Sequence, residues 1–344
     1  MLALDSEPFV ASLSVATDLD GAQAILLAVK ACYSLDALPR LLDEQEDVLP
    51  ADDYYGAPNA SSLRYPADLH LPQPGTSIGL VGQAWIPNGH QRGAIDIGVQ
   101  VGDLRKTVRV FGDRTWEGGS ISDPQPFSSM PLTFENAFGG THHFRPDLPL
   151  GPDSAVAFDA NPVGKGFIGK RRGDELNGFA LPNLEDPSNL ITSLRDRPAP
   201  VAPGFIAPHW LARRRFAGTY DATWQQQRAP LWPRDLDPRF FQAGAPGFNL
   251  EQAFLQGGAP IRLLNLHPAL PRIDTVVPAD RPLARAWLDG SQVDVSLRLE
   301  MLRLEPDAGR MVLVWRGLLR CERKVLKVSR IRIRPADPVA EAVA

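Results

Sequence analysis

Proline placement is the feature that most restricts how this chain can fold. Seventeen of its 33 prolines lie between Ser120 and Pro246. Proline fixes φ and removes a backbone N–H donor, so neither a helix nor a central strand runs far through such a stretch. We therefore expect a mostly irregular central segment of turns and one-turn helices, held in place by aromatic side chains and glycine corners. Irregular segments this long are uncommon in compact domains and usually carry function.

Composition describes an ordinary globular protein. The 344 residues are 44% hydrophobic and 22% charged, which is enough to bury a sizeable core in one or two domains. The formal charge of −4 argues against general nucleic-acid binding. Cys32 and Cys321 are isolated from each other, so neither a disulfide framework nor a zinc site is indicated. The first residues are acidic where a signal peptide is basic, and no long apolar run follows, so we expect a cytoplasmic protein with no membrane partner.

The first part of the chain reads as strands. Ala24–Val29 is a short apolar run suited to a buried strand, and Ser77–Ile86 is a second candidate. Strict alternation followed by a Gly-Asp turn predicts a hairpin within Ala94–Phe111. Asp36–Asp47 is a candidate short helix whose start is limited by Pro39.

The last third returns to strands. Alternation predicts that Val293–Glu305 pairs antiparallel with Met311–Leu319 across the turn EPDAGR, with a β-bulge where the pattern slips near Met301. Val325–Ile333 reads as a further strand. Between the two strand-rich parts, Leu211–Phe216 and a stretch capped by Asp221 are predicted as short helices.

These patterns predict a mainly β fold (β-rich α+β). We expect antiparallel sheets or a sandwich-like scaffold around the proline-, glycine- and aromatic-rich central segment, with a few short helices. The parts would be an N-terminal β-rich part (1–118), a loop-rich segment (119–258) and a C-terminal β part (259–335), forming one integrated domain over 9–320.

Three motifs resemble chemical sites but lack the required context. Ser77 lies in G-x-S-x-G without the strand-then-helix that a nucleophile elbow needs. Gly164 begins G-x-G-x-x-G after a turn, where a dinucleotide site needs a strand. His142 and His143 are adjacent, so on extended chain they point in opposite directions and do not share a metal ion. We expect no catalytic, cofactor or metal site.

Two basic stretches are better candidates for contact with a protein. Arg213–Arg215 lies among aromatic residues, and we favour internal pairing or a protein partner over nucleic acid. Arg330, Arg332 and Arg334 alternate, so they would share one face of a strand. We favour an edge strand protected by its charge, and a docking face for an acidic partner is the alternative.

Ordered blocks along nearly the whole chain also resemble a known family. They include GAQAILLAVKACYSLD, ADDYYGAPNASSLRYPADL, KTVRVFGDRTW, PFSSMPLTFENAFGG, NPVGKGF, LPNLEDP and the run from His209 to Phe241. They are similar to the family catalogued as domain of unknown function 2169, found beside bacterial type VI secretion genes. The resemblance implies an adaptor or chaperone that holds a toxic effector and helps load it onto the VgrG/PAAR spike. Its partners would be effector and spike proteins, with no nucleic acid, small-molecule substrate or cofactor.

The family-motif residues are candidates for structural or partner-binding roles. They are Pro126, Phe127, Met130, Pro131, Glu135, Phe138, Gly139, Gly140, Asn161, Pro162, Gly164, Gly166, Pro182, Asn183, Glu185, Trp210, Arg213, Gly218, Thr219, Tyr220, Asp221, Trp224, Arg228, Asp235, Arg239 and Phe240. We expect the charged members to pair with backbone groups or with one another, and Gly139, Gly140, Gly164 and Gly218 to occupy backbone conformations closed to other residues.

Alternatives from other classes remain open. One is a hydrolase that uses Ser77 or Glu135. Another is a carbohydrate-binding module that presents Trp116, Trp224 and Trp232. For an adaptor, the same three tryptophans and the Arg330–Arg334 face are the expected contact anchors.

Overall fold

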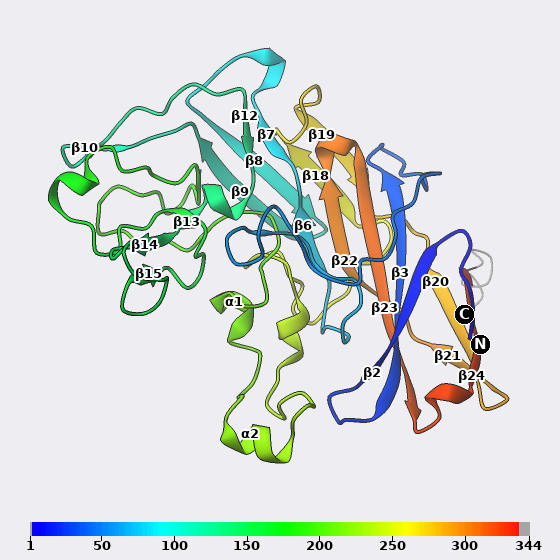
Figure 1. Cartoon of the computed structure of the whole chain (residues 1–344). Helices are drawn as coiled ribbons and strands as arrows, with labels where there is room; N and C mark the ends of the chain where they lie inside the picture. Colours follow the sequence, from blue (N-terminus) through cyan, green and yellow to red (C-terminus); the bar gives the residue numbers. More distant parts are fainter. Residues whose placement is uncertain (1, 337–344) are drawn as a thin grey trace.

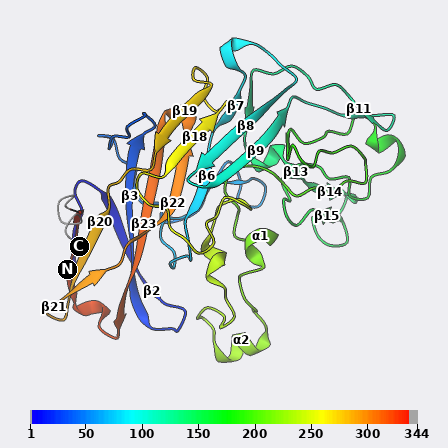
Figure 2. The ribbon, with the colours of Figure 1, turned by 180° about the vertical axis from the view of Figure 1, so that it is seen from behind.

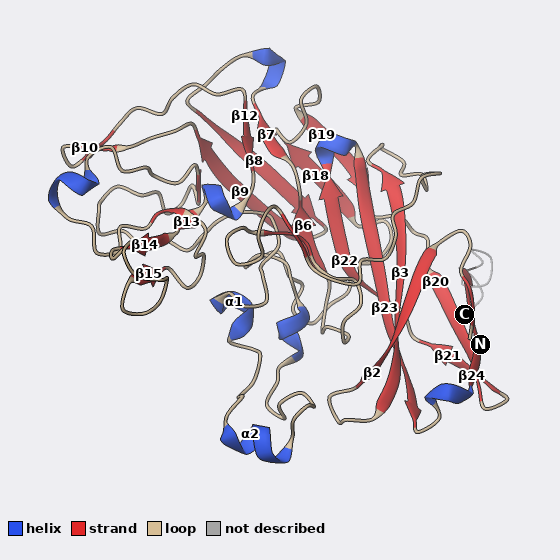
Figure 3. Ribbon diagram, viewed as in Figure 1, coloured by secondary structure: helices blue, strands red, loops and turns tan. Residues whose placement is uncertain are grey.

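The protein is mainly β, as the alternation predicts (Figures 1 and 3). A computed structural model describes residues 2–336. Strands from both ends of the chain share sheets, while the central segment forms irregular lobes beside them (Figure 1). No helix within residues 2–336 is long and apolar enough to cross a membrane.

One five-stranded sheet joins the N-terminal and C-terminal parts. Its order is β2 (Val10–Thr17), β3 (Gln23–Ser34), β23 (Arg310–Glu322), β22 (Arg298–Glu305) and β6 (Ser77–Leu80). The antiparallel β22–β23 pairing confirms the predicted hairpin, and its register shifts between Leu299 and Met301, where a bulge was expected. Val293 is not part of this hairpin, because Ser296 and Leu297 break the chain into two strands of different sheets.

A second five-stranded sheet packs on the same core. It contains β17 (Leu184–Glu185), β9 (Leu104–Phe111), β8 (Ala94–Val101), β18 (Pro260–Leu264) and β19 (Arg272–Val276) in that order. The β8–β9 pairing confirms the predicted hairpin. Buried Val99, Val110 and Ile261 from this sheet join Val29, Leu302 and Val312 from the first sheet in one apolar cluster.

A four-stranded sheet covers one end of the first sheet. Its order is β1 (Ala3–Asp5), β24 (Val328–Pro335), β20 (Pro282–Leu288) and β21 (Ser291–Val295), and it brings the two ends of the described chain together (Figures 1 and 2). Ala286, Ile331 and Ile333 on its inner side are buried in the main core. The strand predicted over Val325–Ile333 begins only at Val328, because Val325–Lys327 forms a 3-10 turn.

The remaining elements are short. The two-stranded sheets are β4 (Asp53–Tyr54) with β5 (Leu63–Tyr65), β7 (Gln83–Trp85) with β12 (Ser129–Pro131), β10 (Trp116–Glu117) with β11 (Ser120–Ile121), β13 (Phe138–Gly139) with β16 (Lys165–Gly166), and β14 (Thr141–His143) with β15 (Ala155–Ala157). The helices are α1 (Leu211–Arg214) and α2 (Ala222–Gln227), and further 3-10 turns lie at Pro87–Gly89, Phe134–Asn136, Gly173–Leu176, Pro238–Phe241 and Pro306–Ala308.

The predicted helix at Asp36–Asp47 is wrong. This segment folds back on strand β3 instead, because the backbone N–H of Ser34 donates to Arg40 and that of Leu42 donates to Cys32. Pro39 has no backbone N–H, and the N–H of Leu42 is used in the bond to β3, so neither is available for a helical hydrogen bond. Both helices predicted in the centre do form, and the Asp221 carboxylate caps α2 by accepting from the Trp224 N–H at 2.8 Å.

A chain of buried charges lies on the face of the first sheet that is turned away from the main core. Lys30, Glu300, Arg303, Glu305 and Arg316 come from β3, β22 and β23, and all are nearly excluded from solvent. The segment 41–73 covers them, and it contributes Glu46 and Asp68. Lys30 Nζ lies 3.2 Å from Glu46, and Arg303 pairs with both Glu46 and Glu305. These buried ion pairs therefore hold the irregular segment 41–73 against the first sheet.

Candidate protein-interaction surface

The outer face of the four-stranded sheet carries arginines from the neighbouring strands β20 and β24. The pleat places Arg330, Arg332 and Arg334 on this face, while Ile331 and Ile333 point into the core. In cross-strand register, Arg330 lies beside Trp287, Arg332 beside Arg285, and Arg334 beside Leu283. We call these residues, together with Arg281, the arginine face.

The sheet order corrects one expectation. We favoured an edge strand protected by charge, but β24 lies between β1 and β20 and is not an edge. Arg330 and Arg332, which have neighbours on both sides, therefore do not guard an open row of backbone groups, whereas Arg334 lies beyond the three residues that pair with β1. Their regular projection from the middle of a sheet needs another explanation, and the docking-face alternative remains.

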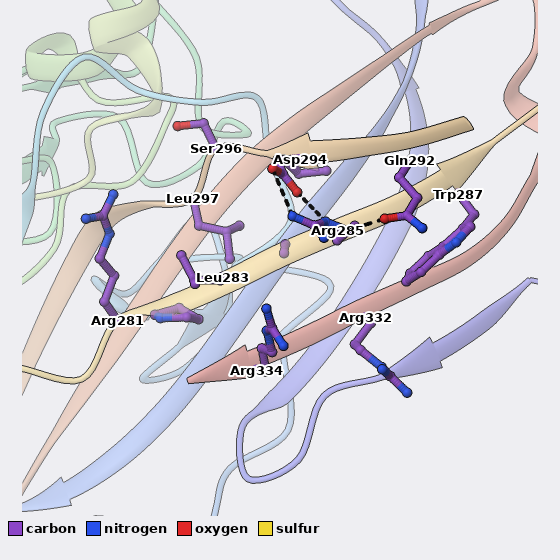
Figure 4. Close-up of a pocket in the computed structure, with 13 residues that line it drawn as sticks. Arg281, Leu283, Arg285, Trp287, Gln292, Asp294, Ser296, Leu297, Arg332 and Arg334 are labelled. Atoms are coloured by element: carbon purple, nitrogen blue, oxygen red, sulfur yellow. Dashed lines mark hydrogen bonds and ion pairs between the residues drawn. The ribbon is translucent and has the colours of Figure 1, made fainter. Parts of the chain in front are cut away.

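Two carboxylates only partly neutralise the arginine face. Arg285 Nε lies 2.6 Å from Asp294, and Arg285 also reaches Gln292 (Figure 4). Hydrogen bonding to Arg285 lowers the pKa of Asp294, which stays ionised at neutral pH. Asp5 is shared by Arg330 and Arg332 at 3.3 and 3.1 Å. Leaving Arg281 aside, the four arginines of β20 and β24 thus face two carboxylates on a chain whose formal charge is −4.

Arg334 is the least engaged of these cations. Its guanidinium forms no side-chain hydrogen bond or close ion pair within residues 2–336, although its charge helps to lower the pKa of Asp294. Figure 4 shows its side chain at the groove beside Leu283 and Arg281. A guanidinium with open donor positions is ready to form a bidentate pair with an incoming carboxylate.

A groove of about 380 Å³ runs over the same face. Trp287 and Leu283 supply its apolar surface, and Leu283 is 41% exposed. The guanidinium of Arg330 lies 5.5 Å from the centre of the Trp287 ring, so cation and ring support each other. Exposed aromatic and arginine side chains are the types that most often dominate binding energy at protein interfaces.

The spacing of the cations suits an extended ligand. Alternate residues on a strand are roughly 7 Å apart, so Arg330, Arg332 and Arg334 form a ladder with that repeat. Acidic side chains at alternate positions of an extended polypeptide have the same repeat. The face can therefore pair several carboxylates in register while Trp287 packs against an apolar residue of the same segment.

The family-motif residues lie elsewhere, in the central segment, and most are tied to the fold. Asn161 donates to the carbonyls of Phe134 and Phe138, and Asn183 donates to Phe111 and Asp113. Glu185 pairs with buried Arg114. Trp210 is 1% exposed and meets Phe134 edge to face.

The charged motif residues pair as expected. Both Glu135 oxygens accept from Ser62 at 2.7 Å, and Asp235 accepts from Thr219. Arg213 donates to the Ile206 and Phe240 carbonyls, and burial lowers its pKa to about 10. Arg228 donates to Trp232 and Leu19, and Arg239 pairs with Asp237.

The motif glycines and prolines shape tight corners. Gly139, Gly140, Gly166 and Gly218 have positive φ. Gly164 does not, but a Cβ there would lie 2.5 Å from the Ala137 carbonyl oxygen. Pro126, Phe127, Met130 and Pro131 lead into or form β12, whereas Pro162 and Pro182 border the β13–β16 pair.

The aromatic anchors are not gathered at one place. Trp116 is 3% exposed and packs with Phe138, Leu181 and Ile191, so the expectation that it contacts a partner is wrong. Trp232 packs on Phe240 and Phe241. The Tyr220 and Trp224 rings meet edge to face, with centroids 4.7 Å apart, on the lobe that carries α2, far from the arginine face in both views (Figures 1 and 2).

The candidate chemical residues are held by structural bonds. Ser77 is buried on β6 and accepts from Gln73 Nε2 at 3.0 Å. His142 Nδ1 accepts from the Lys170 N–H, and His143 contacts the Leu148 carbonyl. Lys165 and Gly166, inside the G-x-G-x-x-G match, form strand β16, so no helix begins there.

Sequence reasoning missed half of the arginine face. The sequence of β20 does indicate an outward face, since Leu283, Arg285 and Trp287 alternate with Ala284, Ala286 and Leu288. It does not indicate which strand lies beside β20. Only the fold shows that β24 and β20 are neighbours and that their exposed residues form one surface.

Comparison with known proteins identifies the family. No protein of curated function and no solved structure matches the chain. A family model of uncharacterized proteins conserved in bacteria matches residues 20–316, which include β20 and β21 but not β1 or β24. The chain belongs to this family, DUF2169.

Proposed function

We propose that the protein is a type VI secretion adaptor that binds an effector and helps to load it onto the VgrG/PAAR spike. Binding would be by protein contacts without covalent chemistry. The arginine face is the observation that supports this most directly, because it offers an exposed cationic ladder, an aromatic anchor and a groove on one rigid sheet. The family-motif residues, in turn, support the scaffold that carries it.

The proposal assigns the arginine face to an acidic, extended segment of the client. Exposed cations accelerate encounter and make binding sensitive to salt, whereas buried anchors slow dissociation. The arginines would therefore attract and align the segment, and Trp287 would hold it. Asp5 and Asp294 already pair with arginines of this face, so a carboxylate of the client has to displace them or share the same guanidinium. This competition lowers the affinity of the client.

The test is co-purification with the products of neighbouring genes. The effector and spike proteins are co-expressed with the tagged chain, and complexes are isolated at moderate salt. Arg332→Glu and Arg334→Glu together should weaken capture of the effector at least tenfold and reduce the salt dependence of the remaining binding. Arg272→Glu is the matched control, because Arg272 is an exposed, paired strand arginine on the second sheet.

The outcomes are distinct. A complex that requires Arg332 and Arg334 but tolerates the Arg272 change supports both the adaptor role and this surface. A complex that tolerates all three changes leaves the adaptor role and removes the arginine face from it. Failure of every genomic neighbour to bind at micromolar concentration would reject the adaptor role. Binding to the client should also raise the Tm of that client with adaptor concentration, by mass action.

A further inference from the structure

Strand β2 is a regular, partly exposed edge of the first sheet. All eight of its residues pair with β3 without a break in register, from Val10 with Lys30 to Thr17 with Gln23. The other side of β2 has no neighbouring strand in the described chain. None of its backbone groups forms a hydrogen bond with a described residue outside β3, apart from an acceptor contact from the adjacent Ser14 hydroxyl.

This edge lacks the usual protection against strand addition. Edges are normally short, charged, interrupted by proline or bulged. The β2 sequence, VASLSVAT, contains no charge, proline or glycine. A strand edge of this kind leaves alternate N–H and C=O groups unpaired, ready to form a further ladder.

Other edges in the same structure are protected. Strand β19 carries Arg272 and Asp274, β21 carries Asp294, and β1 has only three residues. Strand β6 is buried, and its Ile78 N–H already donates to the Phe248 carbonyl. Among these edges, β2 combines length, exposure and an absence of charge.

The side chains of β2 also suit a neighbour. Ala11 and Leu13 pack on the core and fix the strand, while Val15 is 59% exposed. The opposite side presents Ser12 and Ser14, which are small enough to let another strand approach. A valine or threonine on an added strand would cover Val15 through a cross-strand contact.

Charge at the two ends of β2 disfavours a second copy as the occupant. Glu7 precedes the strand and Asp20 follows it; both are exposed, and Asp20 shares its charge with exposed Arg320 at 3.5 Å. In antiparallel self-pairing centred between Leu13 and Ser14, Glu7 of one copy would face Asp20 of the other. Like charges directly opposite each other destabilise a strand pair. A different segment with an uncharged centre and basic ends has no such conflict.

We propose that β2 receives an extended segment of the bound client as a sixth strand of the first sheet. This inference rests on the proposed adaptor function and adds a binding mode to it. The segment would be uncharged and rich in β-branched residues, with Lys or Arg near its ends. Main-chain hydrogen bonds would supply affinity, and the Val15 contact and end charges would supply selectivity.

Hydrogen exchange in the complex with the co-purified effector tests the binding mode. In the free protein, the alternate β2 amides that point away from β3 should exchange quickly, and in the complex they should slow by at least about tenfold. Val15→Lys places a charge on the edge and should weaken the complex about tenfold or more. Leu270→Lys is the control, since Leu270 is 51% exposed in a loop outside this edge.

A synthetic probe separates this inference from the adaptor role. The probe is a short labelled peptide of alternating valine and threonine with lysine pairs at both ends. Its matched control carries N-methyl groups on alternate residues, which block one row of backbone donors and leave the side chains nearly unchanged. Saturable binding of the probe that Val15→Lys and N-methylation both weaken supports strand addition, even if no genomic neighbour binds.

Two results would overturn the inference while leaving the adaptor role intact. One is a stable effector complex in which β2 amide exchange is unchanged and Val15→Lys binds like the parent. The other is dimerisation of the free chain, measured by sedimentation velocity, that Val15→Lys abolishes, because β2 would then be an interface between copies. Failure of all genomic neighbours and of the probe would reject both proposals.

Discussion

Lys30 Nζ lies 3.1 Å from Asp68 Oδ2, and neither side chain is exposed to solvent. Lys30 belongs to β3, whereas Asp68 belongs to the irregular segment that covers the sheet. Asp68 Oδ2 also accepts from the Leu49 N–H, and its backbone carbonyl accepts from Arg316 Nε at 2.6 Å. One carboxylate thus ties together a strand and two parts of the covering segment.

Asp68→Ala should therefore destabilise the fold by about 3–5 kcal/mol, because it leaves Lys30 and Arg316 buried with less compensation. The free energy of unfolding from urea titration measures this. Lys30→Met combined with Asp68→Leu should recover much of the loss, since removing both charges removes the unpaired cation. Asp36→Asn, which breaks an exposed pair with Arg40, should leave the free energy of unfolding nearly unchanged, because solvent screens such pairs. Equal losses in the single and double variants would contradict this account.

Glu300 should give the fold an unusual pH dependence near neutrality. Burial raises its pKa to about 7, and Arg316 only partly opposes that effect. A carboxyl whose folded pKa is raised contributes its stability below its unfolded pKa near 4.5, and loses it as pH rises through 7. The loss is at most about 1.4 kcal/mol per pH unit.

Glu300→Gln removes this titration. The stability of the variant relative to the parent should therefore rise as the pH increases from about 5 to about 7 and should level off above that. Urea unfolding in matched buffers at several pH values measures the difference. Asp274→Asn is the control, because hydrogen bonds from Arg272 and Arg262 lower the pKa of Asp274. Its contribution is lost only in acid, so its difference should stay flat over the same range.

Gly139 should not tolerate even alanine. Its φ is 152°, and an added Cβ would lie 2.2 Å from the backbone oxygen of Asn161. We expect Gly139→Ala to cost about 1–3 kcal/mol, measured as a fall in Tm and in the free energy of unfolding. Gly151→Ala should be nearly neutral, because Gly151 has no positive φ and the nearest atom would lie 4.0 Å away. A neutral Gly139→Ala would remove the steric explanation for this motif glycine.

The parts of the fold that sequence predicts well are those fixed by local alternation. The β8–β9 and β22–β23 hairpins, including the bulge near Met301, follow from a period of two and from turn residues. The buried charges were missed because Lys30 and Arg316 each interrupt an apolar run with no local partner. Lys30 pairs with Glu46, 16 residues along the chain, and with Asp68, 38 residues along. Arg316 pairs with Glu300 across the hairpin and with Asp68 248 residues away, so no motif of neighbouring residues shows these pairs.

The arginine face was only half visible in the sequence for the same reason. Alternation places Arg330, Arg332 and Arg334 on one side of a strand, but it says nothing about the neighbours of that strand. Whether β24 is an edge or an interior strand depends on the pairing of β1 and β20 with it, and those contacts are non-local. The interpretation of β24 as an edge strand was therefore wrong. The pairing with β20 places Trp287 and Arg285 beside its arginines, which favours the interpretation as a docking face.

Arg228 supplies hydrogen bonds that hold the lobe carrying α2 to the first sheet, beside an apolar cluster in which Trp232 packs with Leu26. Its guanidinium donates to the Leu19 carbonyl in the β2–β3 turn at 2.5 Å and to the Trp232 carbonyl at 2.9 Å. Arg228→Ala should increase amide exchange throughout residues 219–235 by about tenfold, because charge-assisted hydrogen bonds to buried carbonyls are typically worth 1.5–3 kcal/mol. Arg234→Ala is the matched control, since Arg234 is an exposed arginine on the same lobe without a hydrogen bond or ion pair in residues 2–336. Faster exchange confined to the lobe in Arg228→Ala, with β3 and β23 unchanged, is the expected pattern. Faster exchange across those strands as well would mean that Arg228 supports the whole sheet, and the lobe would then not be a separable unit.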